Sequence, residues 1–365
     1  MKSSVRFLLL VIALLFSVQL WAQQKLSYKT DSIQFVGTAT GLTYGGDITL
    51  PVIEGKKLPA VIIMSGTGSQ DRDGKMAGHR IFAEIADYLG QNGIIVLRMD
   101  DRGVGQTSGN YDEATTGDFA NDALAAVNYL KSRPEVDAAK IGLVGHSEGG
   151  ASISIAASKS KNVAYLVSIA GLCMSGYDAQ IKQNQDIVSQ AKLPDYDKKR
   201  SNEVNKLMFQ TALKYANSPD MEEMLTQAYT SWKKQDSIYF NSLNIKFDHF
   251  RFPAHRWIPM AAGKWYRYFI QYDPAKTLKK VDIPILAFNG DKDLMVSCEE
   301  NLRNWATFPK AAKHNRVKIV RLKNVNHLLL PCESCVPTEY SKITKGVSRE
   351  MLVTMADWIN SLKNN

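Results

Sequence analysis

Two hydrophobic patterns alternate along most of the chain. Short unbroken apolar runs, such as 60–64, are typical of parallel strands that are buried on both faces. Apolar residues spaced three and four apart, as in 81–89, instead indicate amphipathic helices. Further apolar runs lie at 94–97, 141–144, 163–167, 283–288 and 317–320, a second helical stripe lies at 119–130, and a last helix begins near Ser348. The alternation predicts an α/β fold in which helices flank a mostly parallel central sheet.

Two stretches break this alternation. Residues 33–50 indicate an early β-hairpin, with Gly45-Gly46 at its turn. Residues 172–275 instead carry long charged helical stretches and no strand pattern. Because strands that need sheet partners lie on both sides, we interpret 172–275 as a helical cap (lid) inserted into a single core, which comprises 23–171 and 276–365.

The expected cap is rich in aromatic residues. Thirteen of them fall between positions 229 and 272. Aromatic residues at this density usually belong to a hydrophobic core. A functional alternative is that some of them wall an apolar substrate pocket over the edge of the sheet.

The first 22 residues have the pattern of a secretory signal peptide. Lys2 and Arg6 form a positive start, residues 7–16 are all apolar, and Ala22 offers a small residue at a cleavage point. The apolar run falls short of the roughly 20 residues that a membrane-spanning helix needs. We therefore expect an exported protein, periplasmic or secreted, without a stable membrane anchor after cleavage.

The net charge raises the question of a nucleic-acid partner. The chain has 45 Lys and Arg against 36 Asp and Glu, a formal charge of +9, which falls to +7 without Lys2 and Arg6. The positive residues are scattered, their longest cluster is 198–200, and no nucleic-acid-binding motif accompanies them. The distribution therefore predicts a basic surface and no nucleic-acid partner.

Export also bears on the four cysteines, because an oxidising compartment permits disulfides. Cys332 and Cys335 have C-x-x-C spacing, whereas Cys173 and Cys298 stand apart. The motif lacks the early strand–helix context of a redox-active pair and the second pair of a zinc ribbon. We interpret it as a local structural disulfide, with four unpaired buried thiols as the alternative.

Residues 145–149, Gly-His-Ser-Glu-Gly, carry the clearest chemistry. They directly follow the strand at 141–144 and precede a helix rich in small residues. A strand that turns sharply into a helix strains the backbone of the central residue, and glycines on both sides leave room for its hydroxyl. The helix start also directs unpaired N–H groups toward the charge that forms on an attacked carbonyl. Ser147 is therefore the candidate nucleophile.

A serine nucleophile needs a histidine base and an acid that orients it. His327 follows the last expected strand, and two acids, Asp291 and Asp293, follow the strand at 283–288. The carboxyl ends of parallel strands share one sheet edge, where Ser147 is also expected. Only His327 among the six histidines has this placement, whereas Asp291 and Asp293 are both candidates for the acid and for a turn-forming role.

The sequence resembles the α/β-hydrolase superfamily over essentially the whole mature chain. The resemblance extends to a bacterial esterase group described as serine aminopeptidase-like, through the segments 65–74, 100–105 and 289–293. It implies a triad of Ser147, Asp293 and His327, and an oxyanion hole at the backbone N–H groups of Thr67 and Glu148. One departure is visible, because Ser65 stands where that group usually has a histidine. The oxyanion donors are backbone groups, so we expect the hole to survive this change.

Motifs for cofactors are missing from the sequence. Gly103-Val104-Gly105 follows a strand, but Ser108 occupies the third glycine position of a dinucleotide-binding fingerprint. Neither a phosphate-binding G-x-x-x-x-G-K-[ST] loop nor a zinc-binding H-E-x-x-H motif occurs, so we expect no cofactor and no metal. The charged residues beside the expected site are interpreted as salt bridges that hold its loops, with substrate steering as the alternative. They are Asp71, Arg72, Asp73 and Arg102.

The expected function is hydrolysis of small-molecule carboxylic esters, with small acyl groups. An aminopeptidase or amidase of the same fold is the first alternative, and it needs an acidic cap residue, such as Glu222 or Glu223, to hold a free amine. A non-catalytic binding protein on a hydrolase scaffold is the alternative from another class. Such proteins usually lose a triad member, whereas Ser147, an acid and His327 are all present here.

Overall fold

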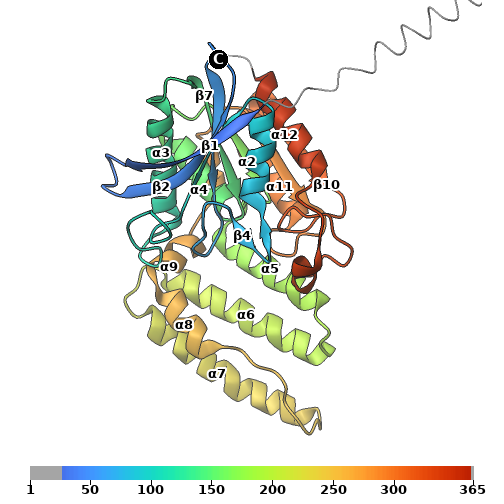
Figure 1. Ribbon diagram of the computed structural model, residues 1–365. Helices are drawn as coiled ribbons and strands as arrows, with labels where there is room; N and C mark the ends of the chain where they lie inside the picture. The colour runs from blue at the N-terminus through green and yellow to red at the C-terminus, as the bar shows by residue number, and fades with distance from the viewer. Residues whose placement is uncertain (1–26, 363–365) are drawn as a thin grey trace, which may run out of the picture.

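An eight-stranded, mostly parallel sheet forms the centre of the molecule, which the computed structural model describes for residues 27–362 (Figure 1). The strands lie in the order β1-β2-β6-β3-β7-β8-β9-β10. Their bounds are β1 Tyr28–Val36, β2 Thr43–Pro51, β3 Leu58–Met64, β6 Ile95–Met99, β7 Val136–His146, β8 Tyr165–Ile169, β9 Ile285–Gly290 and β10 Val317–Leu322. All pairs from β6 to β10 are parallel, while β1 pairs with β2 and β2 with β6 in antiparallel fashion. The predicted fold class is therefore confirmed.

Helices cover both faces of this sheet, because alternate side chains of its central strands point to opposite sides. Ile62 of β3 packs into a core with helices α3 (Thr116–Lys131), α4 (Gly149–Lys159) and α11 (Cys298–Thr307). Its neighbour Ile63 packs into a second core with α2 (Ile81–Gln91) and α12 (Arg349–Ser361). Both residues are buried, so both faces of β3 need apolar side chains, and its sequence is a nearly continuous apolar run.

Local sequence determines where two of the covering helices begin. The Thr115 hydroxyl accepts a hydrogen bond from the Asp118 backbone N–H, and the Asp118 carboxylate accepts one from the Thr115 backbone N–H. This reciprocal capping box satisfies two backbone donors at the start of α3. Ser348 caps α12 in a simpler way, because its hydroxyl accepts from the Met351 backbone N–H. Caps of this kind contribute roughly 1 kcal/mol each.

The predicted position of the first hairpin turn is wrong. The chain reverses between β1 and β2 at residues 37–42, and Gly45 and Gly46 lie inside β2. These glycines permit close packing instead of a turn. A Cβ atom on Gly46 would lie 2.4 Å from the Arg98 carbonyl oxygen, and one on Gly45 would lie 2.4 Å from Gln106 Cβ.

Six helices and no strand of the sheet fill the stretch between β8 and β9, and α6 to α8 project to one side of the sheet (Figure 1). They are α5 (Gly176–Gln190), α6 (Asp195–Tyr215), α7 (Met221–Ser242), α8 (Ala254–Ala262), α9 (Lys264–Ile270) and α10 (Pro274–Leu278). Several of the aromatic residues form a third hydrophobic core here, among them Trp232 and Tyr266. The guanidinium of Arg200 is fully buried beside it and pairs with Asp197, Asp236 and Asp248.

The expected signal peptide, residues 1–22, lies outside the described residues. Within residues 27–362, none of the helices combines the length and apolarity needed to cross a membrane. A small two-stranded antiparallel sheet, formed by β4 (Lys75–Met76) and β5 (His79–Arg80), directly precedes α2.

Candidate active site

Ser147 occupies the sharp turn between β7 and α4. Its φ of 55° lies in the left-handed region, which is costly for a residue with a side chain. Neighbouring glycines make this turn possible. A Cβ atom on Gly145 would lie 2.4 Å from the Gly149 carbonyl oxygen, and one on Gly149 would lie 2.6 Å from the Met64 carbonyl oxygen. The Gly-x-Ser-x-Gly pattern therefore has the strand-to-helix setting that the sequence predicts.

His327 and Asp293 meet at the same edge of the sheet. His327 lies in the loop after β10, and its Nδ1 is 2.9 Å from Asp293 Oδ2 in the loop after β9. Asp293 is itself held on all sides: its Oδ1 accepts from the backbone N–H groups of Met295 (2.8 Å) and Val296 (2.9 Å). Its Oδ2 also accepts from the Asn289 amide at 3.2 Å. Asp293 and His327 are buried, so this carboxylate fixes both the position and the tautomer of the imidazole.

The rival acid, Asp291, faces elsewhere. Its Oδ1 accepts from the backbone N–H of Asn324 at 2.7 Å, and thereby joins the loops after β9 and β10. Its carboxylate therefore links two loops and does not form a local turn, and the structure pairs Asp293 with His327.

Ser147 and His327 line one cavity of about 370 Å³. Thr67 and Glu148 line it too, and within residues 27–362 the backbone N–H of neither residue donates to a protein acceptor. Two free donors beside a serine hydroxyl suit an oxyanion. The remaining wall comes mainly from α5, α9 and the loop after β9. It includes Leu172, Ala179, Gln180, Gln183, Trp265, Phe269, Met295 and Val296.

The two aromatic residues in this wall, Trp265 and Phe269, stack with ring centroids 5.2 Å apart. They belong to the aromatic-rich stretch 229–272, so that stretch supplies residues of the third hydrophobic core and also part of the cavity wall. Glu222 and Glu223 do neither. Both are exposed in the first turn of α7, and neither lines the cavity.

His146 is a residue at this site to which sequence reasoning gave no role. Its Nε2 lies 3.0 Å from the carbonyl oxygen of His327, and since that oxygen only accepts, His146 donates. Burial, together with the neighbouring His327, lowers the pKa of His146 to about 3 and keeps it neutral. The bond fastens the loop of His327 to the turn of Ser147. No local sequence pattern predicts this contact, because His146 and His327 are 181 positions apart.

A second carboxyl group, Asp101, holds the loop that follows β3. Its side chain accepts from the Ser65 hydroxyl (2.6 Å) and from the Gln70 backbone N–H (2.8 Å). Ser65 occupies the position where the esterase group that the sequence resembles usually has a histidine. Its hydroxyl ties this loop to Asp101. The Tyr111 hydroxyl accepts from the Gly68 backbone N–H at 2.7 Å. Burial raises the pKa of Asp101 to about 7.

The charged residues beside the site form the predicted salt bridges. Arg72 pairs with both Asp47 and Asp100, and Arg102 pairs with Asp122. Three further pairs, Asp73 with Arg80, Asp73 with Arg98 and Asp71 with Lys75, extend the set. These contacts join β2, the loop after β3 and the loop after β6, so they hold loops in place.

The C-x-x-C pair is a local disulfide, Cys332–Cys335, as the first interpretation predicted. It closes a turn in the loop that follows His327, and the Glu339 carboxylate accepts from the backbone N–H groups of Glu333 and Cys335 in the same turn. Cys173 and Cys298 are free and buried. In the described part of the chain, no group of three or more His, Cys, Asp or Glu side chains has a metal-binding arrangement.

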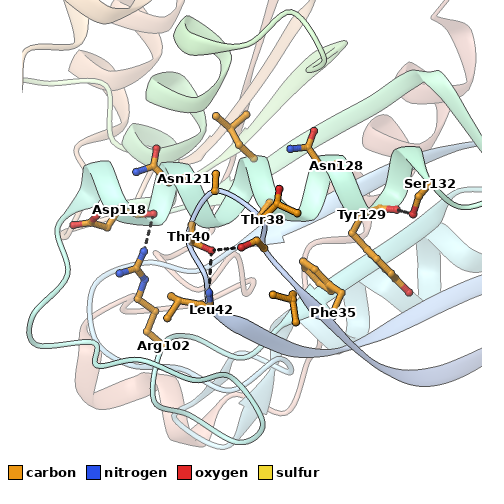
Figure 2. Close-up of a pocket in the computed structure, with 15 residues that line it drawn as sticks. Phe35, Thr38, Thr40, Leu42, Arg102, Asp118, Asn121, Asn128, Tyr129 and Ser132 are labelled. Atoms are coloured by element: carbon orange, nitrogen blue, oxygen red, sulfur yellow. Dashed lines mark hydrogen bonds between the residues drawn. The ribbon is translucent and has the colours of Figure 1, made fainter.

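A separate hollow of about 680 Å³ lies between the loop joining β1 to β2 and the helix α3 (Figure 2). Phe35 and Tyr129 stack in its wall with ring centroids 4.4 Å apart, and Arg102 closes part of another side. It shares no lining residue with the cavity of Ser147.

Comparison with known proteins agrees with this architecture. The chain is 26% identical over 326 residues to Esterase EstD of Thermotoga maritima, a match that covers 88% of this chain and 66% of that protein. It therefore spans slightly less than two thirds of that relative's length.

Solved structures show the same fold at lower identity. A hypothetical protein from Pseudomonas aeruginosa is 15% identical, with a TM-score of 0.53 over 91% of this chain and 93% of its own. Est1E of Butyrivibrio proteoclasticus, solved with ferulic acid bound, is 17% identical, with a TM-score of 0.51 over 89% of this chain and 96% of its own. The family model for the α/β-hydrolase fold matches residues 59–330. The chain therefore belongs to the α/β-hydrolase family.

Proposed function

We propose that this protein is an exported serine hydrolase, periplasmic or secreted, that cleaves small-molecule carboxylic esters. Ser147 is the nucleophile, His327 the base and Asp293 the acid that orients it. The observation that carries the proposal is one cavity lined by a strained serine, by a histidine paired with a buried carboxylate and by two free backbone donors. The name of the relative EstD, an esterase, supports the ester as substrate class.

The reaction begins with proton transfer. His327 Nε2 accepts the proton of the Ser147 hydroxyl as Ser147 Oγ attacks the ester carbonyl. Asp293 stabilises the positive charge that forms on the imidazole, because its Oδ2 accepts from Nδ1. The backbone N–H groups of Thr67 and Glu148 donate to the oxyanion, and each such donor is typically worth about 3–4 kcal/mol in the transition state.

The intermediate collapses when His327 returns its proton to the leaving alcohol. Ser147 is then acylated, and a water molecule that is deprotonated by His327 attacks the acyl carbon. The same two donors stabilise the second tetrahedral intermediate. The acid is released, and Ser147 regains its proton from His327.

The size and lining of the cavity support small substrates. Its volume of about 370 Å³ lies near the lower end of the range for small-molecule sites. Trp265, Phe269 and Leu172 make part of the wall apolar, while Gln180 and Gln183 place amide groups there. An ester with a short acyl chain and a small alcohol fits such a space.

Two measurements test the proposal. A fluorophosphonate probe should label Ser147 in the wild-type protein and should not label the S147A variant. A panel of short and long p-nitrophenyl esters, measured beside aminoacyl-nitroanilides, should show fastest turnover of the short acyl esters. Failure of the probe to react with intact Ser147 would favour a non-catalytic binding protein, and a clear preference for nitroanilides would favour an aminopeptidase.

A further inference from the structure

The side chain of Glu148 lies at the junction of three segments. Only 3% of the residue is exposed, and its carboxyl group accepts three hydrogen bonds. Oε2 accepts from the Thr67 hydroxyl at 2.6 Å. Oε1 accepts from the Thr116 hydroxyl at 2.6 Å and from the Trp265 indole N–H at 2.9 Å. These donors belong to the loop after β3, the start of α3 and the cap helix α9.

None of these three partners is a cation. In the described part of the chain, Glu148 forms no salt bridge with a Lys, Arg or His side chain. Burial raises the pKa of Glu148, and the hydrogen bonds from Thr116, Thr67 and Trp265 partly oppose this rise. A buried carboxyl group without a counter-ion is costly, so a leucine or alanine here would relieve a cost. An apolar side chain at this position could not accept the three hydrogen bonds from Thr67, Thr116 and Trp265.

One of those bonds reaches the reaction centre of the proposed hydrolase. Thr67 lines the cavity and its backbone N–H donates to no acceptor in residues 27–362, while its side-chain hydroxyl is fixed by Glu148. Glu148 also lines the cavity, and its own backbone N–H likewise has no acceptor in the described residues. One residue therefore supplies one oxyanion donor through its backbone and fixes the residue that supplies the other through its side chain.

Another of the three bonds, from the Trp265 indole, reaches helix α9. Trp265 lines the cavity of Ser147 and stacks on Phe269, and the only polar atom of its side chain, Nε1, donates to Glu148. This fixes the rotation of the indole relative to the Ser147 turn. The aromatic wall and the oxyanion donors are thus aligned through one carboxyl group.

We propose that Glu148 is a positioning residue that sets the oxyanion donor of Thr67 and the cap residue Trp265 in register with Ser147. This inference rests on the proposed ester hydrolysis. Glu148 acts through Thr67 and Trp265 and not by proton transfer. Removing its hydrogen bonds therefore lowers stabilisation of the transition state through Thr67 and also releases the cavity-wall residue Trp265.

The test compares E148L with E148Q. In E148Q the amide oxygen accepts from Thr116 and Trp265, and the amide N–H donates to the Thr67 hydroxyl oxygen, so all three contacts survive. We expect kcat of E148Q to stay within about threefold of wild type on a short p-nitrophenyl ester. In E148L we expect kcat to fall about 10- to 100-fold, since a displacement of about 1 Å costs up to about 10²-fold. Rates are normalised to the number of sites that a fluorophosphonate labels.

A second variant acts at the other end of the bond. T67V deletes the hydroxyl and keeps both the backbone N–H and the bond between Glu148 and Trp265. It should therefore lower kcat as E148L does, with KM within about threefold of wild type. The double variant E148L/T67V should be no slower than E148L, because both changes break the same contact. T211V is the matched control, since the Thr211 hydroxyl donates only to the Leu207 carbonyl within α6, and it should leave kcat unchanged. If E148L yields no folded protein, T67V and E148Q carry the test.

Three results would contradict the inference. E148L with a wild-type kcat per labelled site, T67V with a wild-type kcat, or E148Q as slow as E148L would each remove the positioning role of Glu148 while leaving the esterase intact. A wild-type protein that neither reacts with the probe nor turns over the ester would instead refute the proposed function, and the inference with it.

Discussion

Replacing Asp293 with asparagine probes the proposed acid most directly. The carboxylate of Asp293 faces four donors: two backbone N–H groups at Oδ1, and the Asn289 amide and His327 Nδ1 at Oδ2. An asparagine has only one acceptor oxygen, so it cannot satisfy both pairs. If its NH2 faced the backbone donors, two hydrogen bonds would be lost in a buried site, at a cost of about 1–3 kcal/mol each.

The asparagine therefore turns its NH2 toward His327. Nδ1 must then accept, and the imidazole proton moves to Nε2, which is the atom that has to take the proton of Ser147. A base held in the wrong tautomer costs about 10⁴-fold in kcat. That loss corresponds to about 5.5 kcal/mol of transition-state stabilisation. KM should change little, because Asp293 does not line the cavity.

The assay measures kcat and KM for a short p-nitrophenyl ester, with far-UV circular dichroism and thermal unfolding to verify that the variant is folded. D291N is the matched control, because Asp291 accepts a single backbone hydrogen bond from Asn324 and has no contact with His327. We expect its kcat to stay within about threefold of wild type. A D293N variant that retains more than a tenth of wild-type kcat, or a larger loss in D291N, would refute the assignment.

Three other substitutions give separate tests. A Cβ atom on Gly66 would lie 2.7 Å from Ser147 Cβ, so G66A should lower kcat at least about tenfold without changing far-UV circular dichroism, and a wild-type rate would show that the loop yields. The pKa of Asp101 is about 7 when folded and near 4 when unfolded, so the folded state holds an extra proton between those values. Wild type should therefore lose stability as pH rises from about 4 to 7, by at most about 4 kcal/mol, and D101N should lack this share of the decline in chemical denaturation. C332S removes the short disulfide to Cys335 and should cost roughly 1–2 kcal/mol in the same assay, whereas no change would mean that other contacts hold the turn.

The turn of Ser147 was predictable because its determinants are local. An apolar strand, two glycines and a run of small residues stand next to one another in the sequence, and each limits the same few backbone angles. The misplaced hairpin turn shows the limit of such reasoning. A Gly-Gly pair is typical of a turn, but Gly45 and Gly46 instead leave room for Arg98 and Gln106, which pack against them from distant parts of the chain.

The same limit explains what was left open or missed at the site. Asp291 and Asp293 stand two positions apart after one strand, and only the path of the loop after β10 determines which of them meets His327. The contacts of Glu148 with Thr67 and of His146 with His327 span 81 and 181 positions. Sequence spacing predicts that these residues lie at one sheet edge, but it does not predict where their side chains point.

The hydrogen bond between His146 and His327 has a consequence for how this fold changes in evolution. In the described chain, the side-chain hydrogen bonds of His146, Asp293 and His327 all end on residues outside α5 to α10. Insertions, deletions or exchanges among α5 to α10 therefore leave the proposed proton-transfer residues assembled. A lineage can therefore change the cavity wall in this region without separating the residues of the proposed proton transfer.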